Sequence, residues 1–256
     1  MWWVKGKRFL IVLMGLTVLA ALVAGGVYIK KSPYFALSGV EITIEGKRFL
    51  NKREVFEKAD LLLGTNIFAL NLQDIKKRLE LHPWVAEAFV SRKLPDKIFI
   101  KVREEKPLAM LSINGEIWLV NEKGHIFARA PKNLLKELPA LEGVSEKEIK
   151  NRRLDAQKVE VLKLLAKLKK SETLVPPYAN ISQIKFLPDG FLLLTRDALL
   201  IKFAGNKLDD YEKAYKKLDR IFVYLYDTKQ YQRVKTVRLD YPENSAALIF
   251  KKGRRS

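Results

Sequence analysis

The sequence predicts an α+β protein with one N-terminal transmembrane helix, a compact β-α-α-β-β module, and a C-terminal domain in which two helices cover an antiparallel sheet. Three observations predict this class. An uncharged apolar run opens the chain, strand and helix periodicities then alternate, and short alternating segments separated by turns follow, with two long helical stretches among them. The expected segments are 1–8 as a cytoplasmic tail, 9–29 as the transmembrane helix, 35–105 as the first module, 107–251 as the second domain and 252–256 as a basic tail.

The apolar run from Phe9 to Ile29 has the length of a membrane span. As a helix, its 21 residues at about 1.5 Å each extend roughly 31 Å, close to the ~30 Å of a bilayer core. A cleaved signal peptide is the alternative, because Lys5 and Lys7 precede the run and the small residues Ala24 and Gly25 lie near its end. The run exceeds the ~7 to 15 apolar residues of a signal peptide, which favours an uncleaved anchor.

The expected orientation of the span depends more on the sizes of the two segments that flank it than on their charge. Basic residues stand on both sides of it, so the positive-inside bias is slight. Long domains can cross the membrane largely regardless of their charge. We therefore expect the N-terminus in the cytoplasm and residues 32–256 outside.

The first module begins with a strand and a capped helix. Residues 40–46 alternate between apolar and polar side chains, as in a half-buried strand. Asn51 is the expected cap of a helix in which Glu54 reaches back to the cap, and Gly64 is the expected end. The predicted inner stripe of this helix is Val55, Phe56, Ala59 and Leu62.

A second helix and two strands complete the module. Asn71 caps the helix, apolar residues repeat at helical spacing, and Pro83 closes it. Residues 85–91 and 97–103 alternate on either side of a turn at 94–96. The repeating apolar residues of the helix are Leu72, Ile75 and Leu79.

The second domain reads as hairpins combined with two helices. The expected strands are 108–113, 116–120, 125–128, 181–187, 191–195, 198–203, 234–239 and 245–250, the last two joined by a turn at 241–244. Residues 138–143 are expected to form a loop. The expected helices are 145–170, which presents Leu154, Val161, Leu165 and Leu168 inward, and 207–225, with a stripe of Tyr211, Ala214, Tyr215, Leu218 and Phe222.

The composition argues against several kinds of chemistry. There is no cysteine and there are two histidines, His82 and His125, so an enzyme would need carboxylates, lysines or a serine-lysine pair. Phosphate-binding glycine loops and metal-ligand spacings are absent from the sequence. The net charge of +19 suits anionic lipids or acidic partners, and its lysines are interspersed with acids, which disfavours nucleic-acid binding. We expect no catalytic residues, cofactor, metal or small-molecule substrate.

The last predicted strand is a candidate binding edge. Residues 245–250 carry no charge, and an edge strand with free N–H and C=O groups can accept a strand from a partner. The alternative is an internal strand whose apolar residues belong to the core. The sequence pattern leaves both open.

The β-α-α-β-β order directly after a single span resembles a POTRA domain, and its residues resemble the bacterial division family FtsQ, called DivIB in Gram-positive species. The family commonly reads Glu-Arg-x-Pro where this chain has residues 104–107, with an acid at the arginine position. The segment 238–241 is the counterpart of a family Asp-Leu-Arg-Tyr. The residues that carry the resemblance include 40–46, Glu54, Val55, Ala59, 63–67, Leu72, Ile75, Leu79, 82–85, Ala88, Val90, Arg92, Leu94, Pro95, Ile98, Ile100, Val102 and Pro107.

The resemblance implies a non-enzymatic scaffold of the divisome that binds FtsB and FtsL outside the membrane at the division septum and regulates septal cell-wall synthesis. It also tips the choice at the last strand towards an edge. The partner-binding residues that it implies are Lys207, Tyr241, Ser245, Ala246, Ala247, Leu248, Ile249 and Phe250. The alternatives are a POTRA-bearing transport or outer-membrane assembly factor and a membrane-tethered enzyme.

Overall fold

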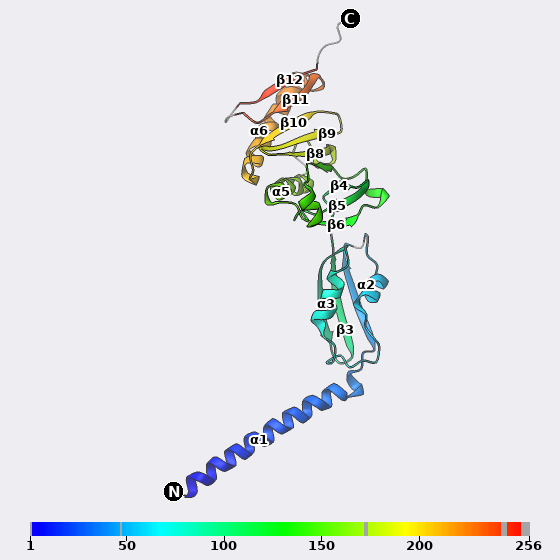
Figure 1. Cartoon of the computed structure of the whole chain (residues 1–256), viewed down its shortest axis with the longest axis vertical. Helices are drawn as coiled ribbons and strands as arrows, with labels where there is room; N and C mark the ends of the chain where they lie inside the picture. Colours follow the sequence, from blue (N-terminus) through cyan, green and yellow to red (C-terminus); the bar gives the residue numbers. More distant parts are fainter. Residues whose placement is uncertain (1, 47, 172–173, 242–244, 252–256) are drawn as a thin grey trace. The chain divides into compact units, whose positions relative to one another are not determined.

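The structure is a computed structural model that describes residues 2–46, 48–171, 174–241 and 245–251, with side chains from Leu13 onward. The chain divides into two compact units, residues 1–105 and residues 106–256 (Figure 1). The expected basic tail at 252–256 and most of the expected turn at 241–244 lie outside the described residues.

The N-terminal helix α1 (Trp2–Lys31) contains the predicted span. Its segment Leu13–Lys31 is long and apolar enough to cross a membrane, and the side chains of this segment are exposed. The helix also includes most of the segment expected as a tail. At about 1.5 Å per residue, the 30 residues of the helix extend about 45 Å, which exceeds the ~30 Å thickness of a bilayer core.

The rest of the first unit has the predicted β-α-α-β-β order. Its three-stranded sheet has the order β1-β3-β2, with β1 parallel and β2 antiparallel to β3. Helices α2 and α3 pack on one face, where apolar side chains of helices and strands form a single core. The elements are η1 (Pro33–Phe35), β1 (Gly39–Glu45), α2 (Lys52–Ala59), α3 (Leu72–Glu80), β2 (Val85–Lys93) and β3 (Lys97–Glu104).

Helix α2 confirms the predicted start and corrects the predicted end. The Asn51 side chain accepts from the Glu54 N–H at 2.9 Å, and the Glu54 carboxylate accepts from the Asn51 N–H at 3.1 Å. The helix stops at Ala59 rather than near Gly64. Asp60 follows in a left-handed conformation (φ 52°), which turns the chain away from the helix axis.

The early end of α2 changes which side chains face the core. Val55 and Ala59 are buried as predicted. Phe56 is 37% exposed and Leu62 is 74% exposed, so the prediction that both belong to the inner stripe is wrong. The chain leaves the helical period before Leu62, and Leu61 enters the core in its place.

Glu104, at the end of β3, holds the irregular segment that connects β1 to α2. The side chain is buried, and its carboxylate accepts backbone N–H groups from Arg48 at 3.0 Å and from Phe49 and Leu50 at 2.6 Å each. Gly46 (φ 115°) passes so close that a Cβ there would lie 2.6 Å from Glu104 Oε2. The carboxylate therefore accepts the backbone N–H groups of this segment, as a neighbouring strand would, and these donors would otherwise lack hydrogen-bond partners.

The second unit combines strands and helices in the predicted sequence order, with an added strand. Its strands are β4 (Ala109–Ile113), β5 (Glu116–Val120), β6 (Ile126–Arg129), β7 (Ala140–Glu142), β8 (Ile181–Leu187), β9 (Gly190–Thr195), β10 (Leu200–Ala204), β11 (Val234–Arg238) and β12 (Ala247–Phe250). Its helices are α4 (Glu146–Lys150), α5 (Ala156–Lys170) and α6 (Leu208–Asp227), with short η2 (Lys132–Leu134), η3 (Tyr178–Asn180) and η4 (Tyr231–Arg233).

Within the described residues these nine strands form one mixed sheet in the order β12-β11-β10-β9-β8-β7-β4-β5-β6. The α+β class is confirmed, but the sheet is not wholly antiparallel. β7 pairs in parallel with both β4 and β8, and β10 pairs in parallel with β11 because helix α6 connects them. Residues 138–143, expected as a loop, therefore contain the strand that joins the two halves of the sheet.

Helices α5 and α6 contribute to the core on one face of this sheet. The predicted helix 145–170 is two helices, because Asp155 starts a second one by accepting the Lys158 N–H at 2.9 Å. Leu154 lies between α4 and α5 and is still buried. The predicted stripe of α6 is confirmed, with Tyr211, Tyr215, Leu218 and Phe222 buried and Ala214 packed at its margin.

We predict that Glu104→Gln destabilises the first module by about 1.5–3 kcal/mol, because a neutral amide offers one acceptor oxygen where the carboxylate offers two. Calorimetry of the full chain in detergent should show a lower unfolding midpoint. Glu57→Gln is the control, since it removes an exposed ion pair with Arg53 and should cost under about 0.5 kcal/mol. Equal midpoints for the two variants would contradict the role assigned to Glu104.

Candidate partner-binding edge

The last strand, β12, is the outermost strand at one end of the nine-stranded sheet. It runs antiparallel to β11, with Ala247 opposite Arg238 and Leu248 opposite Val237. Among the described residues no strand pairs with its other side. Ser245 and Ala246, which were expected in this strand, precede it and are exposed.

The register shows which backbone groups of β12 point outward. Lys251 N–H donates at 2.7 Å to the carbonyl of Arg233, the residue just before β11, so the backbone of Lys251 faces the side on which β11 lies. The pairing has a register shift between Val234 and Thr236, so the extra residue lies in β11 and the alternation along β12 is unbroken. Because the backbone groups of successive residues point to opposite sides of a strand, Ile249 also faces β11. Leu248 and Phe250 therefore direct their N–H and C=O groups to the open side.

The side chains of β12 divide between the two faces of the sheet. Leu248 packs against the hydrophobic core. Ile249, 46% exposed, lies on the opposite face across from Thr236, and Phe250 is 42% exposed. The strand thus offers apolar side chains together with its free backbone groups.

A charged cluster fixes the chain that leaves β11. Asp240 accepts two hydrogen bonds from Arg238, at 2.7 and 3.0 Å, and forms an ion pair with Lys202 at 3.0 Å. Hydrogen bonding to Arg238, reinforced by Lys202, holds the pKa of Asp240 well below its usual range. The Arg238 guanidinium lies 5.1 Å from the ring centre of Tyr241, which places that ring, 42% exposed, next to the cluster.

A basic groove of about 550 Å³ lies between Tyr241 and the first turns of α6. The Lys217 ammonium also donates to the carbonyl of Ser245, just before β12. Lys207 is the exposed cap residue of α6, and Gly205, two residues before it, lines the groove. The charged residues that line the groove are Asp210, Lys213, Lys216, Lys217 and Arg220.

The four basic residues of the groove are not among the residues predicted for the site. The signal that could have identified them is their spacing, since residues 213, 216, 217 and 220 follow one stripe of a helix. Of the predicted residues, the structure brings Tyr241 and the strand residues to one end of the sheet, with the groove beside them. Lys207 lies near the groove but does not line it.

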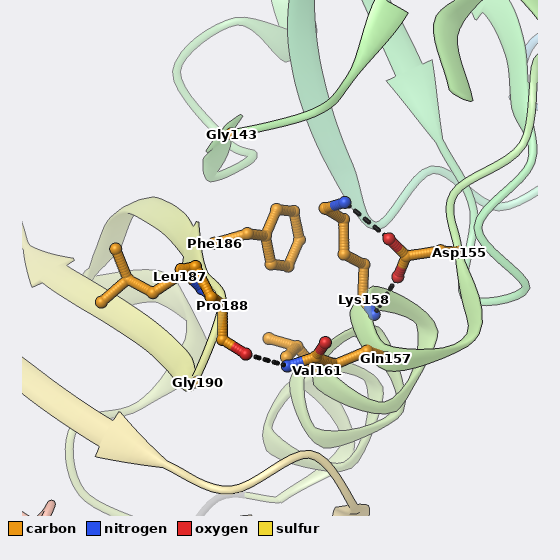
Figure 2. Close-up of a pocket in the computed structure, with 9 residues that line it drawn as sticks. All are labelled: Gly143, Asp155, Gln157, Lys158, Val161, Phe186, Leu187, Pro188 and Gly190. Atoms are coloured by element: carbon orange, nitrogen blue, oxygen red, sulfur yellow. Dashed lines mark hydrogen bonds and ion pairs between the residues drawn. The ribbon is translucent and has the colours of Figure 1, made fainter. Parts of the chain in front are cut away.

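A second concave site, of about 300 Å³, lies where α5 meets the turn between β8 and β9 (Figure 2). Gln157 Nε2 donates across it to the Pro188 carbonyl at 3.4 Å, and the ring of Phe186 lies 5.6 Å from Lys158 Nζ. Ser145 lies close to Lys158 at this site, so these two residues are the candidates for the serine-lysine pair that an enzyme would need. The arrangement of these polar groups decides whether it is a catalytic pair.

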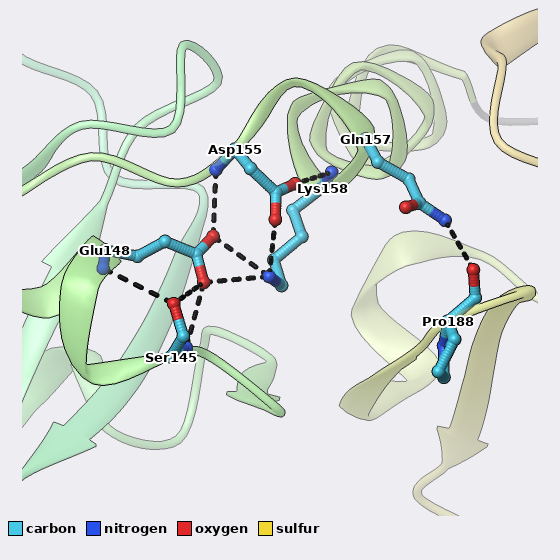
Figure 3. A network of polar contacts seen from close by, with 6 residues as sticks. All are labelled: Ser145, Glu148, Asp155, Gln157, Lys158 and Pro188. Atoms are coloured by element: carbon cyan, nitrogen blue, oxygen red, sulfur yellow. Dashed lines mark hydrogen bonds and ion pairs between the residues drawn. The ribbon is translucent and has the colours of Figure 1, made fainter.

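The polar groups form a closed ion-pair cluster (Figure 3). The Glu148 carboxylate accepts from Ser145 Oγ at 2.7 Å and from Lys158 Nζ at 2.8 and 2.9 Å. Lys158 Nζ also donates to Asp155 at 2.7 Å. Glu148 further accepts the Asp155 N–H at 2.8 Å, so one buried carboxylate joins the beginnings of α4 and α5.

The protonation of this cluster suits structure rather than catalysis. Burial opposes the charge on Lys158, but hydrogen bonds from its ammonium to Asp155 and Glu148 outweigh this and raise its pKa. Burial likewise raises the pKa of Glu148, but hydrogen bonds from Lys158, Ser145 and the Asp155 backbone lower it to about 2. A lysine held protonated cannot remove a proton from Ser145. In the described part of the chain, no group of three His, Asp or Glu side chains is placed to hold a metal ion.

Two family models match the chain. The POTRA domain, FtsQ-type, matches residues 40–105, and the C-terminal region of cell division protein FtsQ/DivIB matches residues 109–239. The second match alone covers more than half of the 256 residues. Strand β12 follows the matched region.

The chain is also similar to proteins named cell division protein FtsQ. That of Syntrophotalea carbinolica is 32% identical over 136 residues, which cover 53% of this chain and 47% of the relative. That of Myxococcus fulvus is 30% identical over 145 residues (55% and 50%), and that of Rickettsia bellii 36% identical over 84 residues (33% and 32%). The chain thus spans about half, or less, of the length of these relatives.

Because Glu148 has a lowered pKa in the folded state, we predict an acid-sensitive stability. The unfolded side chain takes up a proton near pH 4.5 and the folded one near pH 2. The stabilisation is present above about pH 4.5 and is lost as the pH falls towards 2, and a shift of this size corresponds to roughly 3 kcal/mol.

Unfolding of the full chain in detergent, followed by circular dichroism between pH 6 and pH 2, measures this effect. Glu148→Gln should be less stable at pH 6 and should lack that part of the pH dependence. Glu146→Gln, on the exposed side of the same helical turn, is the control. The prediction fails if Glu148→Gln keeps the full pH slope of the unmodified protein.

Proposed function

Since the chain belongs to the FtsQ/DivIB family of cell division proteins, we propose that it is a non-enzymatic scaffold that binds FtsB and FtsL through β12. The one candidate span among the described residues, at the N-terminus, and the family match support a single-pass membrane protein of the division machinery. In this proposal both folded units lie outside the cytoplasmic membrane, at the septum. The scaffold links division proteins and regulates septal cell-wall synthesis.

The observation that carries the proposal is the open side of β12. Leu248 and Phe250 leave backbone donors and acceptors without a neighbouring strand among the described residues. An added strand would satisfy these groups, and its alternate side chains would meet Ile249 on one face and Phe250 on the other. Such an addition requires no rearrangement of the sheet.

The basic groove supports an acidic partner segment beside the added strand. Lys213, Lys216 and Arg220 line it together with Lys217, which reaches the carbonyl of Ser245. A partner that entered the groove with carboxylates and continued along β12 would use both features. Complementary charge of this kind directs association and fixes register. Lys207 would then contribute from the rim of the groove.

The family match disfavours one alternative, and the ion pairs of Lys158 disfavour the other. A POTRA-bearing transport or outer-membrane assembly factor would carry a different C-terminal region from the FtsQ/DivIB type found at residues 109–239. The serine-lysine pair that a membrane-tethered enzyme would need is absent from the cluster at Ser145, where Lys158 is bound to two carboxylates.

The edge can be tested by removing one outward N–H. We predict that Phe250→Pro lowers the amount of FtsB and FtsL that co-purifies with the chain from native membranes by about tenfold relative to Phe250→Ala. Both variants lose the aromatic ring, and only proline removes the backbone donor and adds bulk at the edge. Because this N–H points away from β11, the fold should tolerate both changes.

Thermal unfolding of the two variants provides the control for folding. Equal unfolding midpoints with unequal capture support strand addition at β12. Equal capture by the two variants contradicts it, even if FtsB and FtsL are bound. Capture of outer-membrane assembly proteins in place of FtsB and FtsL would overturn the functional proposal itself.

The proposed orientation has its own test. A reporter enzyme that is active only in the cytoplasm, fused after Ser256, should be inactive, and one that is active only outside the membrane should be active. Long domains cross the membrane largely regardless of charge, which is the physical basis of this expectation. Full activity of the cytoplasmic reporter would place both folded units inside the cell.

A further inference from the structure

The topology of the first unit brings three connecting segments to the end at which the span emerges. The linker after α1 exchanges hydrogen bonds with the loop between α2 and α3, since Gly64 N–H donates to the Leu37 carbonyl and Leu37 N–H to the Thr65 carbonyl, each at 2.9 Å. The turn between β2 and β3 joins them, because Ser38 N–H donates to the Asp96 carbonyl at 2.9 Å. All three segments therefore lie at one end of the sheet.

Asn66 ties this end directly to the last turn of α1. Its side-chain amide donates to the Ile29 carbonyl at 2.9 Å and to the Ser32 carbonyl at 3.1 Å. Ile29 belongs to the segment with the length and composition of a span. The loop that carries Asn66 is thus held beside the C-terminal end of this segment.

Large apolar side chains on these three segments are exposed. Tyr34 on the linker is 67% exposed, Leu62 and Leu63 on the loop are 74% and 62% exposed, and Leu94 in the turn is 64% exposed. We call these four residues the apolar collar. Packing within the unit does not account for the collar, because the core of this unit is formed by other residues.

We propose that the apolar collar inserts into the bilayer interface around the emerging span, so that the first module is seated on the membrane and not merely tethered to it. The ligand is the lipid surface, in particular its boundary between headgroups and acyl chains. Leucine side chains gain from leaving water there, and a tyrosine places its ring among the acyl chains and its hydroxyl among the headgroups.

Two features of the structure favour a lipid surface over a protein partner. The first is continuity, since hydrogen bonds join the collar segments to the span itself. The second is charge. Lys30 and Lys31 are exposed at the end of α1. At the end of the sheet Lys93 and Lys97 pair with Glu41, at 2.7 and 3.6 Å, and Asp96 in the turn is the other acid, so these four lysines outnumber the two acids. The excess of positive charge beside the collar suits anionic headgroups.

The proposal is independent of the binding edge on β12, because it concerns only the first unit and the lipid. The chain contains no cysteine, so single labelling sites can be introduced without further change. Leu81 provides a matched control. It is 74% exposed, like Leu62, but it follows α3 at the opposite end of the sheet.

The test uses the full chain, one copy in each lipid nanodisc of phosphatidylethanolamine and phosphatidylglycerol at 3:1, with a fluorophore on a single cysteine. Leu62→Cys, Leu63→Cys, Leu94→Cys and Leu81→Cys are compared. A nitroxide on the upper acyl chain of the lipid quenches only labels that enter the interface. We expect at least threefold stronger quenching at the three collar positions than at Leu81→Cys.

A second measurement distinguishes insertion from proximity. Adding Leu62→Glu and Leu63→Glu to the Leu94→Cys chain should reduce quenching at residue 94 by at least half, because two carboxylates oppose insertion. Adding Leu81→Glu should leave it unchanged. Quenching at the collar equal to that at Leu81→Cys overturns the proposal, and so does quenching at residue 94 that does not respond to the two glutamates.

Discussion

Three residues of β7, Ala140–Glu142, hold the two halves of the nine-stranded sheet together. On one side Ala140 pairs with Met110 of β4, and on the other all three residues pair with β8. Gly143 follows with φ 81°, and a Cβ there would lie 2.8 Å from the Phe186 carbonyl oxygen. The chain can therefore turn off the sheet only through a residue without a side chain. Within the described sheet, β7 is the strand that connects β8 to β12 with β4, β5 and β6.

The ion-pair cluster secures the chain immediately beyond the junction. Ser145 caps α4, and Glu148 binds both this cap and the N–H of Asp155, which caps α5. One carboxylate thus fixes the angle between two helices, and α5 then packs with α6 over the sheet. A buried charge is tolerated here because Lys158 and backbone donors satisfy it fully. The site resembles a catalytic pair in its residue types and serves as a structural joint.

Much of the fold was predictable from the sequence because its elements are long and strongly periodic. Strand β1, helix α3 and the stripe of α6 from Tyr211 to Phe222 follow their periods closely. The strand β7 could not be found this way, since three residues between Pro139 and Gly143 are too few to show alternation. The break before α5 was missed because Asp155 interrupts a continuous helical period by capping, which is a local interaction. The segment of β12 was predictable as a strand. Which of its backbone N–H and C=O groups point outward depends on the register of its pairing with β11, which the sequence does not give.

The shortness of β12 limits how strongly its backbone can hold a partner. Two outward residues, Leu248 and Phe250, can form at most four main-chain hydrogen bonds with an added strand. At about 1 kcal/mol net for each, they supply about 4 kcal/mol, which corresponds to a dissociation constant near 1 mM. Strand addition alone would therefore release its partner quickly. A lasting complex needs further contacts, and the basic groove beside Tyr241 lies where they could form. In this proposal β12 sets the register of the partner strand, and the side chains of the groove determine the lifetime of the complex.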